Sequence, residues 1–307
     1  MIMNKKELWG IDLGGTKVEG IIMKSSSSAE SVFRDRVSTE ANLGYEHVLN
    51  QIKRLVDMME AKAGYRPEKI GMGTPGTMDP HTGLFKNSNS TVLNFKPLQH
   101  DLEKLLGIKV LTANDANCFA LAETRLGVVK EKFPKAEVVF GVIMGTGCGG
   151  GIVVNNKVIN GLQGIAGEWG HNFLDESGGK CYCGKVGCVE NVIAGPALER
   201  YYREQSGQSL KLKEIYTRAV DKSDVVAVKT IHRLHEMFGK ALSVVINILD
   251  PDVIVIGGGV GNIPSIYTEG INYLKQYVFN DRLDTPVVKP LLGDSAGVFG
   301  AAFLTEN

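Results

Sequence analysis

The chain lacks an excess of charge of either sign, because 34 lysines and arginines balance 34 aspartates and glutamates among its 307 residues. It therefore has no broad positive field of the kind that holds nucleic acid or an anionic membrane non-specifically. Any anion must be bound at a local site. We accordingly expect no nucleic-acid partner and no membrane partner.

Long hydrophobic runs are missing as well. The N-terminal residues lead straight into a strand, without the apolar segment and cleavage site of a secretory signal. The most apolar later stretch, residues 242–249, is broken by Asp250 and Pro251, well short of the ~20 residues that a spanning helix needs. The five cysteines form an odd number, and three of them cluster with a histidine, which fits a reducing compartment better than disulfides. We therefore expect a cytoplasmic protein.

What the chain does contain is a group of metal-binding residue types. Ten residues after His171 begins a Cys-x-Cys-x4-Cys run made of Cys181, Cys183 and Cys188. Three thiolates and one imidazole fill the four corners of a tetrahedral zinc site and leave no position for a substrate, so the metal would be structural. A loop of reduced thiols with a surface histidine is the alternative, because the spacing is not that of the commonest zinc fingers.

Two carboxylates flank this cluster. Glu168 stands three residues before the histidine, and Glu190 follows the last cysteine by two residues. Neither is needed to bind the metal, although both would be held near it. We expect these two side chains to hold a ligand.

Two glycine-rich hairpins open the two halves of the chain. The first turn follows the apolar run 8–13, and a second copy, 131 residues later, follows the run 138–144 and leads into strand 152–154. The repeat suggests two related α/β lobes that face each other across a cleft. A dinucleotide-binding fold is disfavoured, because a strand and not a helix follows the glycines of the second turn.

Glycine turns let backbone N–H groups approach a phosphate closely, so the two turns can grip one triphosphate. Asp12 ends the first strand, where it can hold a magnesium ion through water. Ordinary turn chemistry explains Asp12 and Thr16 equally well when each is taken alone. The turn residues expected to bind ATP are Gly14, Gly15, Thr16, Lys17, Gly145, Thr146 and Gly147.

The rest of the first half alternates helices and strands. Apolar spacing predicts helices at 44–64 and 97–107, and apolar runs predict strands at 69–73 and 108–112. The strand at 69–73 leads into a turn at Gly76 whose amides can meet a ligand, although a purely structural turn fits the composition equally well.

Asp115 follows the strand at 108–112 and precedes a predicted helix at 118–126. An open α/β sheet presents reactive groups to a ligand at the carboxyl ends of its strands, which makes Asp115 the candidate catalytic base. The alternative is that Asp115 or Asn114 merely caps the helix that follows.

The second half contains a predicted long helix at 224–249 and a buried strand at 253–256. The turn Gly257, Gly258 and Gly259 comes directly after this strand. A turn without side chains would admit an adenine or a ribose.

Taken in order along nearly the whole chain, six motifs resemble those of the ROK family (repressors, open reading frames, sugar kinases). The zinc-and-glutamate signature is highly specific, whereas the glycine turns are shared with the wider superfamily of sugar kinases, heat-shock proteins and actin. The motifs are DLGGTK (12–17), NDAN (114–117), GTGCGG (145–150), GEWGH (167–171), CYCGKVGCVE (181–190) and GGG (257–259).

The resemblance implies a two-lobed, actin-like (ribonuclease H-like) α/β fold with ATP, Mg²⁺ and a hexose in a cleft. It implies a smaller lobe at 1–118, joined by a C-terminal helix at about 296–307, and a larger lobe at 119–295 that carries the zinc loop. It makes Asp115 the base, and it makes Asn114, Glu168 and Glu190 sugar contacts. The family's repressors carry a DNA-binding domain ahead of the first hairpin, where this chain has only roughly ten residues. We therefore expect a kinase.

Among the kinases, the segments 86–94, 167–172 and 247–252 look most like those of bacterial fructokinases and mannokinases, and Asn89 is thereby expected to contact the sugar. The implied reaction is phosphorylation of the C6 hydroxyl of fructose, with mannose and glucose as further candidates. N-acetylglucosamine or N-acetylmannosamine kinase activity, or a non-catalytic sugar sensor, are the alternatives. A homodimer is a family-based expectation, and a role for Asp294 is left open.

Overall fold

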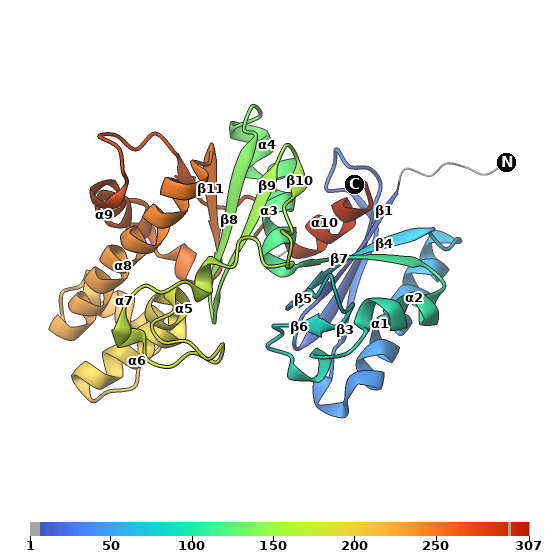
Figure 1. Ribbon diagram of the computed structural model, residues 1–307, viewed down its shortest axis with the longest axis horizontal. Coiled ribbons are helices and arrows are strands. Elements are labelled where there is room, and N and C mark those ends of the chain that lie inside the picture. Colours follow the sequence, from blue (N-terminus) through green and yellow to red (C-terminus); the bar gives the residue numbers. More distant parts are fainter. Residues whose placement is uncertain (1–6, 294–295, 307) are drawn as a thin grey trace. The chain divides into compact units, whose positions relative to one another are not determined.

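The computed structural model describes residues 7–293 and 296–306, so Asp294 lies outside the described residues. The chain forms two compact units, shown in Figure 1. The first unit comprises Met1–Glu137, Gly151–Gly167 and Leu291–Asn307, and the second comprises Val138–Gly150 and Glu168–Pro290. The predicted boundary between residues 118 and 119 falls inside a helix, so the compact units differ in extent from the expected lobes.

The first unit is built on a five-stranded sheet. Its strands, in spatial order, are β3 (Ser31–Ser38), β2 (Lys17–Met23), β1 (Leu8–Leu13), β4 (Lys69–Thr74) and β7 (Lys109–Asn114). The predicted hairpin is confirmed, because β1 and β2 pair antiparallel. Strands β1, β4 and β7 run parallel, which brings their carboxyl ends to the same edge of the sheet.

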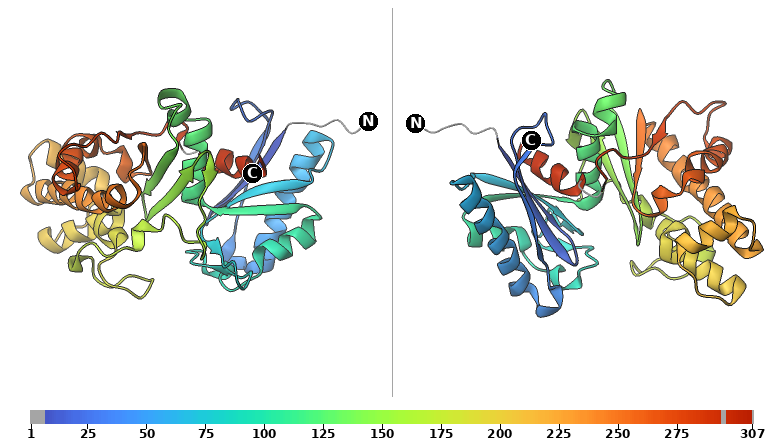
Figure 2. Two further views of the ribbon diagram at one scale, coloured as in Figure 1. Left: turned by 45° about the horizontal axis from the view of Figure 1, so that its top comes forward. Right: turned by 180° about the vertical axis from the view of Figure 1, so that it is seen from behind.

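Helices cover both faces of this sheet, as Figures 1 and 2 show. Helices α1 (Tyr45–Ala63) and α2 (Leu98–Leu106) enclose the hydrophobic core on one face, and α10 (Ala296–Phe303) packs on the other. Gly20 allows the approach of α1, because a Cβ there would lie 2.8 Å from Met59 Sδ. Gly10 allows the approach of α10, because a Cβ there would lie 2.5 Å from the backbone nitrogen of Ala302.

The predicted C-terminal ends of α1 and α2 are correct, whereas the predicted start of α3 is not. Gly64 and Gly107 adopt positive φ angles of 75° and 66° and terminate α1 and α2, as expected of glycine beyond the last helical turn. Helix α3 (Asp115–Arg125) starts three residues earlier than the predicted start at residue 118. The reason is the side chain of Asn114, which caps the helix and makes Asp115 its first residue.

Glu123 of α3 is fully buried, and its carboxylate accepts backbone N–H groups of residues that lie outside α3. Its carboxylate accepts the backbone N–H of Val128, at the start of α4 (Val128–Lys132), at 2.9 Å. It also accepts the N–H groups of Leu291 and Leu292 at 3.0 and 2.8 Å. One acid thereby ties α3 and α4 to the segment that leads into α10.

The second sheet has the strand order β10 (Lys157–Val158), β9 (Cys148–Val154), β8 (Val138–Met144), β11 (Val253–Gly257) and β12 (Val287–Val288). Strand β9 begins at Cys148 and not at the predicted residue 152, so the turn is shorter than expected and several glycines belong to the strand. Gly151 is one of them, and a Cβ there would lie 2.5 Å from the carbonyl oxygen of Ala116. Close backbone approach, and not a turn, explains that glycine. A two-stranded hairpin, β5 (Thr77–Met78) with β6 (Phe85–Lys86), completes the sheets.

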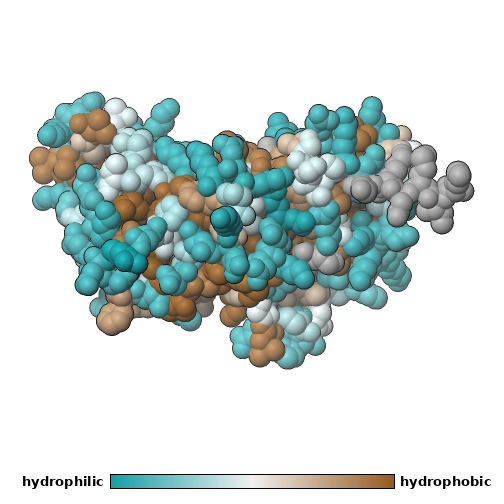
Figure 3. All heavy atoms as spheres, turned by 90° about the horizontal axis from the view of Figure 1, so that it is seen from above, coloured by the Kyte–Doolittle hydropathy of each residue, from teal (hydrophilic) through white to brown (hydrophobic). Residues whose placement is uncertain are grey.

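The helices of the second unit are α5 (Val189–Ile193), α6 (Gly195–Ser206), α7 (Leu212–Val220), α8 (Val225–Leu249) and α9 (Glu269–Tyr277). Helix α8 confirms the predicted long helix. Among the described residues no helix combines the length and the apolar character required to cross a bilayer. Figure 3 agrees in that hydrophilic side chains cover most of the face it shows, between smaller hydrophobic patches.

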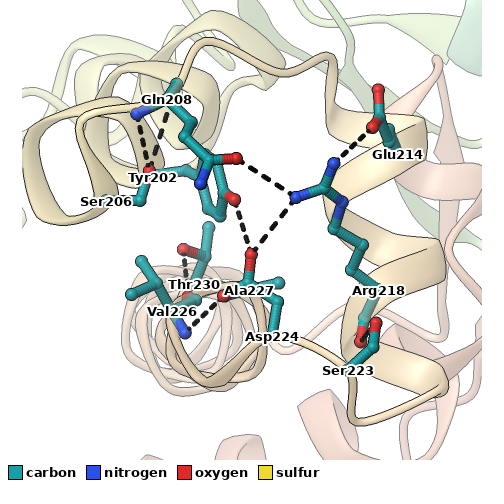
Figure 4. A network of polar contacts seen from close by, with 10 residues as sticks. All are labelled: Tyr202, Ser206, Gln208, Glu214, Arg218, Ser223, Asp224, Val226, Ala227 and Thr230. Carbon is teal, nitrogen blue, oxygen red and sulfur yellow. Dashed lines mark hydrogen bonds and ion pairs between the residues drawn. The ribbon is translucent and has the colours of Figure 1, made fainter.

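A polar network holds the start of α8 against α6 and α7 (Figure 4). The carboxylate of Asp224 caps α8 through the N–H groups of Val226 and Ala227, at 2.8 and 3.1 Å. It also accepts the hydroxyl of the buried Tyr202, and Arg218 lies 3.7 Å away. The Tyr202 hydrogen bond is the main cause that lowers the pKa of Asp224, so this cap stays charged.

Candidate functional site

The first glycine turn is held by Thr39. Gly14 donates its N–H to the carbonyl of Lys17 at 2.9 Å, which closes the turn between β1 and β2. Thr39, itself buried, donates its hydroxyl to Gly14 O at 2.8 Å and its N–H to Thr16 O at 3.0 Å. The carbonyls are thus engaged on the protein side, while Gly15 and Thr16 are exposed. This geometry suits a turn that offers amides to an anion.

Asp12 and Asp115 lie at the carboxyl ends of two strands of the first sheet that are separated only by β4. Burial raises the pKa of Asp12 to about 6, and the charges of Asp115 and Glu19 add to that effect, while Lys17 opposes it. Desolvation by the surrounding protein also raises the pKa of Asp115, and the backbone N–H of Ala116 opposes that shift only in part. The residue nevertheless keeps an exposed face. The structure therefore brings the predicted base and the predicted magnesium residue together, with like charges that repel each other.

Asn114, and not Asp115, caps α3. The side-chain oxygen of Asn114 accepts the N–H of Asn117 at 2.8 Å. Asp115 accepts the N–H of the adjacent Ala116, also at 2.8 Å. The capping alternative therefore applies to Asn114, and the carboxylate of Asp115 is not needed to start the helix.

Helix α10 packs on Asp12 and on the first turn of α3, a feature that motif reasoning missed. A Cβ on Gly297 would lie 2.7 Å from Asp12 Oδ2, and one on Gly300 would lie 1.8 Å from the carbonyl oxygen of Cys118. Both glycines are therefore required by contact with the residues around Asp12 and Asp115. The signal available in the sequence was their spacing of three within an apolar helix.

Gly76 and Asn89, two predicted sugar contacts of the first unit, lie in different settings. Gly76 is buried, and a Cβ there would lie 2.6 Å from the carbonyl oxygen of Lys86, so close packing alone accounts for this glycine. Asn89 is exposed in a loop that Asn94 fixes through two hydrogen bonds of 2.9 Å to the backbone of Ser88. Only Asn89 presents an exposed polar side chain.

In the second unit, the second glycine turn meets the Gly257–Gly259 turn. Gly145 donates its N–H to Gly147 O at 2.8 Å, which closes the turn after β8. Gly258 has a φ of 83°, and a Cβ there would lie 2.3 Å from the carbonyl oxygen of Met144. The two turns predicted to bind different parts of ATP are thus neighbours at the ends of β8 and β11.

Glu190 connects this turn to the cysteine cluster. It lies in the first turn of α5, two residues after Cys188, and its Oε2 accepts the N–H of Cys148 at 2.9 Å. A Cβ on Gly147 would lie 2.5 Å from the same oxygen. Sequence reasoning placed Glu190 near the metal but missed its contact with the glycine turn.

Glu168 precedes a short 3-10 helix, Trp169–His171, that packs on strand β9. Trp169 is buried and donates its indole N–H to Gly149 O at 2.9 Å. A Cβ on Gly170 would lie 1.8 Å from Cys148 O. The glycine and the tryptophan therefore fix the backbone on which Glu168 and His171 stand.

The four predicted metal ligands converge. The ligand atoms of His171, Cys181, Cys183 and Cys188 all lie within 4.8 Å of one another. Cys183 and Cys188 have their sulfurs 3.6 Å apart, and Cys181 Sγ lies 3.6 Å from His171 Nδ1. These separations exceed a disulfide bond of about 2.05 Å and match the edge of a tetrahedron with metal–sulfur bonds of about 2.3 Å. The donor set and its spacing therefore fit zinc.

The comparisons with known proteins agree with this geometry. The sequence profile of the ROK family matches residues 8–307. The N-acetyl-D-glucosamine kinase of Histophilus somni is 36% identical over 307 residues, which cover 96% of this chain and 98% of that protein. The solved ROK hexokinase from Thermus thermophilus is 32% identical, with a TM-score of 0.85 and 97% of both chains covered. A ROK glucokinase from Streptomyces griseus, in complex with glucose and AMPPNP, is 26% identical with a TM-score of 0.77, covering 97% of this chain and 98% of that one.

The structural neighbours have the actin-like ATPase fold, which confirms the predicted fold class. The match extends over both units and includes all six motifs. The chain is therefore a member of the ROK family, and it groups with the sugar kinases of that family.

Proposed function

We propose that the protein transfers the γ-phosphoryl group of ATP to the C6 hydroxyl of N-acetylglucosamine. The name of the Histophilus somni relative supports this sugar better than the fructose that the sequence resemblance suggested. Differences of a few pocket contacts, each about 1–3 kcal/mol, separate related hexoses. Fructose, mannose, glucose and N-acetylmannosamine are therefore the competitors to measure.

The observation that carries the proposal is the placement of Asp115. Its carboxylate stands at the carboxyl end of β7, keeps an exposed face and is relieved of helix capping by Asn114. Its pKa is raised by the surrounding protein, which makes the carboxylate a better proton acceptor than an ordinary surface aspartate. These are the properties of a general base.

In the proposed reaction Asp115 takes the proton of the sugar C6 hydroxyl. The C6 oxygen forms a bond to the γ-phosphorus of ATP as the bond from that phosphorus to the β–γ bridging oxygen breaks, and ADP leaves. Because such transition states are mostly loose, alignment and charge stabilisation supply most of the acceleration. The glycine turns at 14–17 and 145–147 would align the phosphates, and the turn at 257–259 would receive the nucleoside.

Sugar contacts are assigned to Asn114, Glu168 and Glu190, with Asn89 as an outer contact. Asn114 is adjacent to the base, and Glu190 reaches the second glycine turn. Hydrogen bonds from sugar hydroxyls to carboxylates are stronger than those between neutral groups. We assign Gly76 a packing role beside the sugar loop and no direct contact.

Asp12 fits a magnesium ion held through water. Its carboxylate lies among the negative charges of Asp115 and Glu19, which Lys17 offsets only in part, so a cation is favoured there. When bound with ATP, the ion neutralises charge on the phosphates. Asp12 and Thr16 would hold its hydration shell.

Zinc would serve as a structural brace. His171, Cys181, Cys183 and Cys188 would hold it, and no side chain of this set is left to bind the sugar. The ion would keep Glu168 and Glu190 in place from either end of the loop.

A coupled ADP-release assay tests the proposal, with the five sugars named above and kcat/KM measured for each. We expect the highest kcat/KM for N-acetylglucosamine. A higher kcat/KM for fructose would favour a fructokinase, as the sequence resemblance suggested. Sugar binding by calorimetry without ADP release from any of the five would identify the alternative, a non-catalytic sensor.

The homodimer and the cytoplasmic location expected from the sequence stay predictions. Light scattering of the purified protein at several concentrations checks the first. Fractionation of the source cells checks the second.

A further inference from the structure

Tyr182 lies between two of the predicted zinc ligands, and the motifs assign it no role. Its side chain is 69% exposed, yet its hydroxyl lies 3.0 Å from Nε2 of His171. The two rings also meet edge to face, with centroids 5.1 Å apart at an interplanar angle of 89°. The ring of Tyr182 is thus exposed to solvent while its hydroxyl contacts a predicted zinc ligand.

Histidine chemistry supplies one. The Nδ1 atom of His171 faces Cys181 Sγ and is therefore the nitrogen turned toward the metal position. A neutral imidazole that gives one lone pair to a metal carries its proton on the other nitrogen. Histidine ligands of metals nearly always donate that second N–H to an oxygen, which fixes both the tautomer and the ring orientation. The Tyr182 hydroxyl oxygen is in place to accept it.

The same ring orientation bears on the sugar residues. His171 ends the 3-10 helix that begins directly after Glu168. His171 therefore connects the predicted metal position directly to the short helix that follows Glu168, one of the predicted sugar contacts.

We propose that Tyr182 is a positioning residue of the zinc site, an inference that rests on the proposed binding of zinc. Its hydroxyl accepts the Nε2–H of His171 and so holds Nδ1 toward the metal. Its ring packs against the imidazole and limits rotation of that side chain.

The test compares zinc release from the full-length wild type, Tyr182→Phe and Tyr182→Leu to a chromophoric chelator. The phenylalanine variant keeps the ring and loses only the hydroxyl, and we expect it to release zinc about tenfold faster than the wild type. The visible spectrum of its cobalt(II)-substituted form should also shift, because the histidine ligand changes orientation. Tyr216→Phe, at a part-buried tyrosine of α7, is the matched control and should release zinc like the wild type.

Other outcomes overturn the inference in distinguishable ways. Wild-type release from Tyr182→Phe with fast release from Tyr182→Leu would assign the effect to the ring and remove the role of the hydroxyl. A sugar KM that stays raised in Tyr182→Phe at full zinc occupancy would make Tyr182 a direct sugar contact. Absence of zinc from the wild-type protein would refute the zinc site itself, whereas inactivity toward all sugars would leave the zinc measurements valid.

Discussion

The two units hold the carboxylates of the proposed site by different means. In the first unit, Asp12 and Asp115 stand at strand ends of one sheet, and the glycines of α10 pack against their surroundings. In the second unit, Glu168 and Glu190 lie outside any strand, on segments joined by the cysteine cluster. The first pair is therefore positioned by the packing of one sheet and its helices, whereas the second pair would depend on the proposed zinc and a few hydrogen bonds. Loss of zinc should thus impair the second pair alone.

The largest effect is expected at the first pair. Asp115→Asn keeps the shape of the side chain but cannot accept a proton, so kcat should fall by about a hundredfold or more while the KM values for sugar and ATP change little. Steady-state kinetics measures this split. Asp281→Asn, at an exposed aspartate, is the control. Near-normal turnover of Asp115→Asn would remove the base assignment.

A smaller and reversible effect is expected at the metal. Cys183→Ser removes one thiolate ligand, so the sugar KM should rise by about tenfold and the Tm should fall by several degrees, because zinc binding contributes directly to folding stability. The KM for ATP should change less. Chelator-treated wild type should behave like the variant and recover when zinc is added back. A sugar KM that is the same with and without zinc would contradict the bracing role.

Glu190→Gln separates the two roles of that residue. The variant keeps the contact geometry with Cys148 but loses the charge, which weakens a hydrogen bond by about 1 kcal/mol, or roughly fivefold in KM. This change should raise the KM for ATP as well as for sugar, because Glu190 supports the second glycine turn directly. Glu176→Gln, an exposed residue of the same loop, is the control. An unchanged KM for ATP would show that the turn does not need this carboxylate.

The smallest effect concerns stability at Asp12. Its pKa is raised to about 6 from an ordinary value of 3.8, so the folded state binds more protons than the unfolded state between these pH values. Stability contributed by this group therefore falls as pH rises from about 4 to 6, and the loss is complete above 6. Asp12→Asn should raise the Tm by about 2–4 °C at pH 7.5 without magnesium and by nothing at pH 3.5.

Thermal unfolding of the wild type and Asp12→Asn across that pH range measures the difference. An equal Tm difference at all pH values would show that packing, and not charge, is the cause. The same variant should bind MgATP more weakly, so the residue would trade stability for function.

Periodicity and glycine positions were sufficient to predict much of the first unit. The helices α1 and α2 end at Gly64 and Gly107 as expected, because apolar spacing and a glycine beyond the last turn are local signals. The convergence of His171 with Cys181, Cys183 and Cys188 was predictable for a similar reason, since their residue types and spacing are specific.

Features that depend on contacts between distant segments were not predictable. The early start of α3 depends on the hydrogen bond from the N–H of Asn117 to the side chain of Asn114. Composition alone did not decide whether Asn114 or Asp115 caps the helix. The contact of Gly297 with Asp12 joins segments at opposite ends of the chain. The hydrogen bond from Cys148 to Glu190 likewise spans 42 residues, and no local sequence pattern predicts it.

The buried carboxylate of Glu123 has an evolutionary consequence. It recognises Leu291 and Leu292 only through their amide groups, so the identity of those two side chains is irrelevant to this anchor. Relatives can therefore vary freely at these positions, proline excepted, and keep the path of the chain. At position 123 itself, the side chain must be as long as glutamate and must accept hydrogen bonds. We therefore expect few substitutions at that position among relatives.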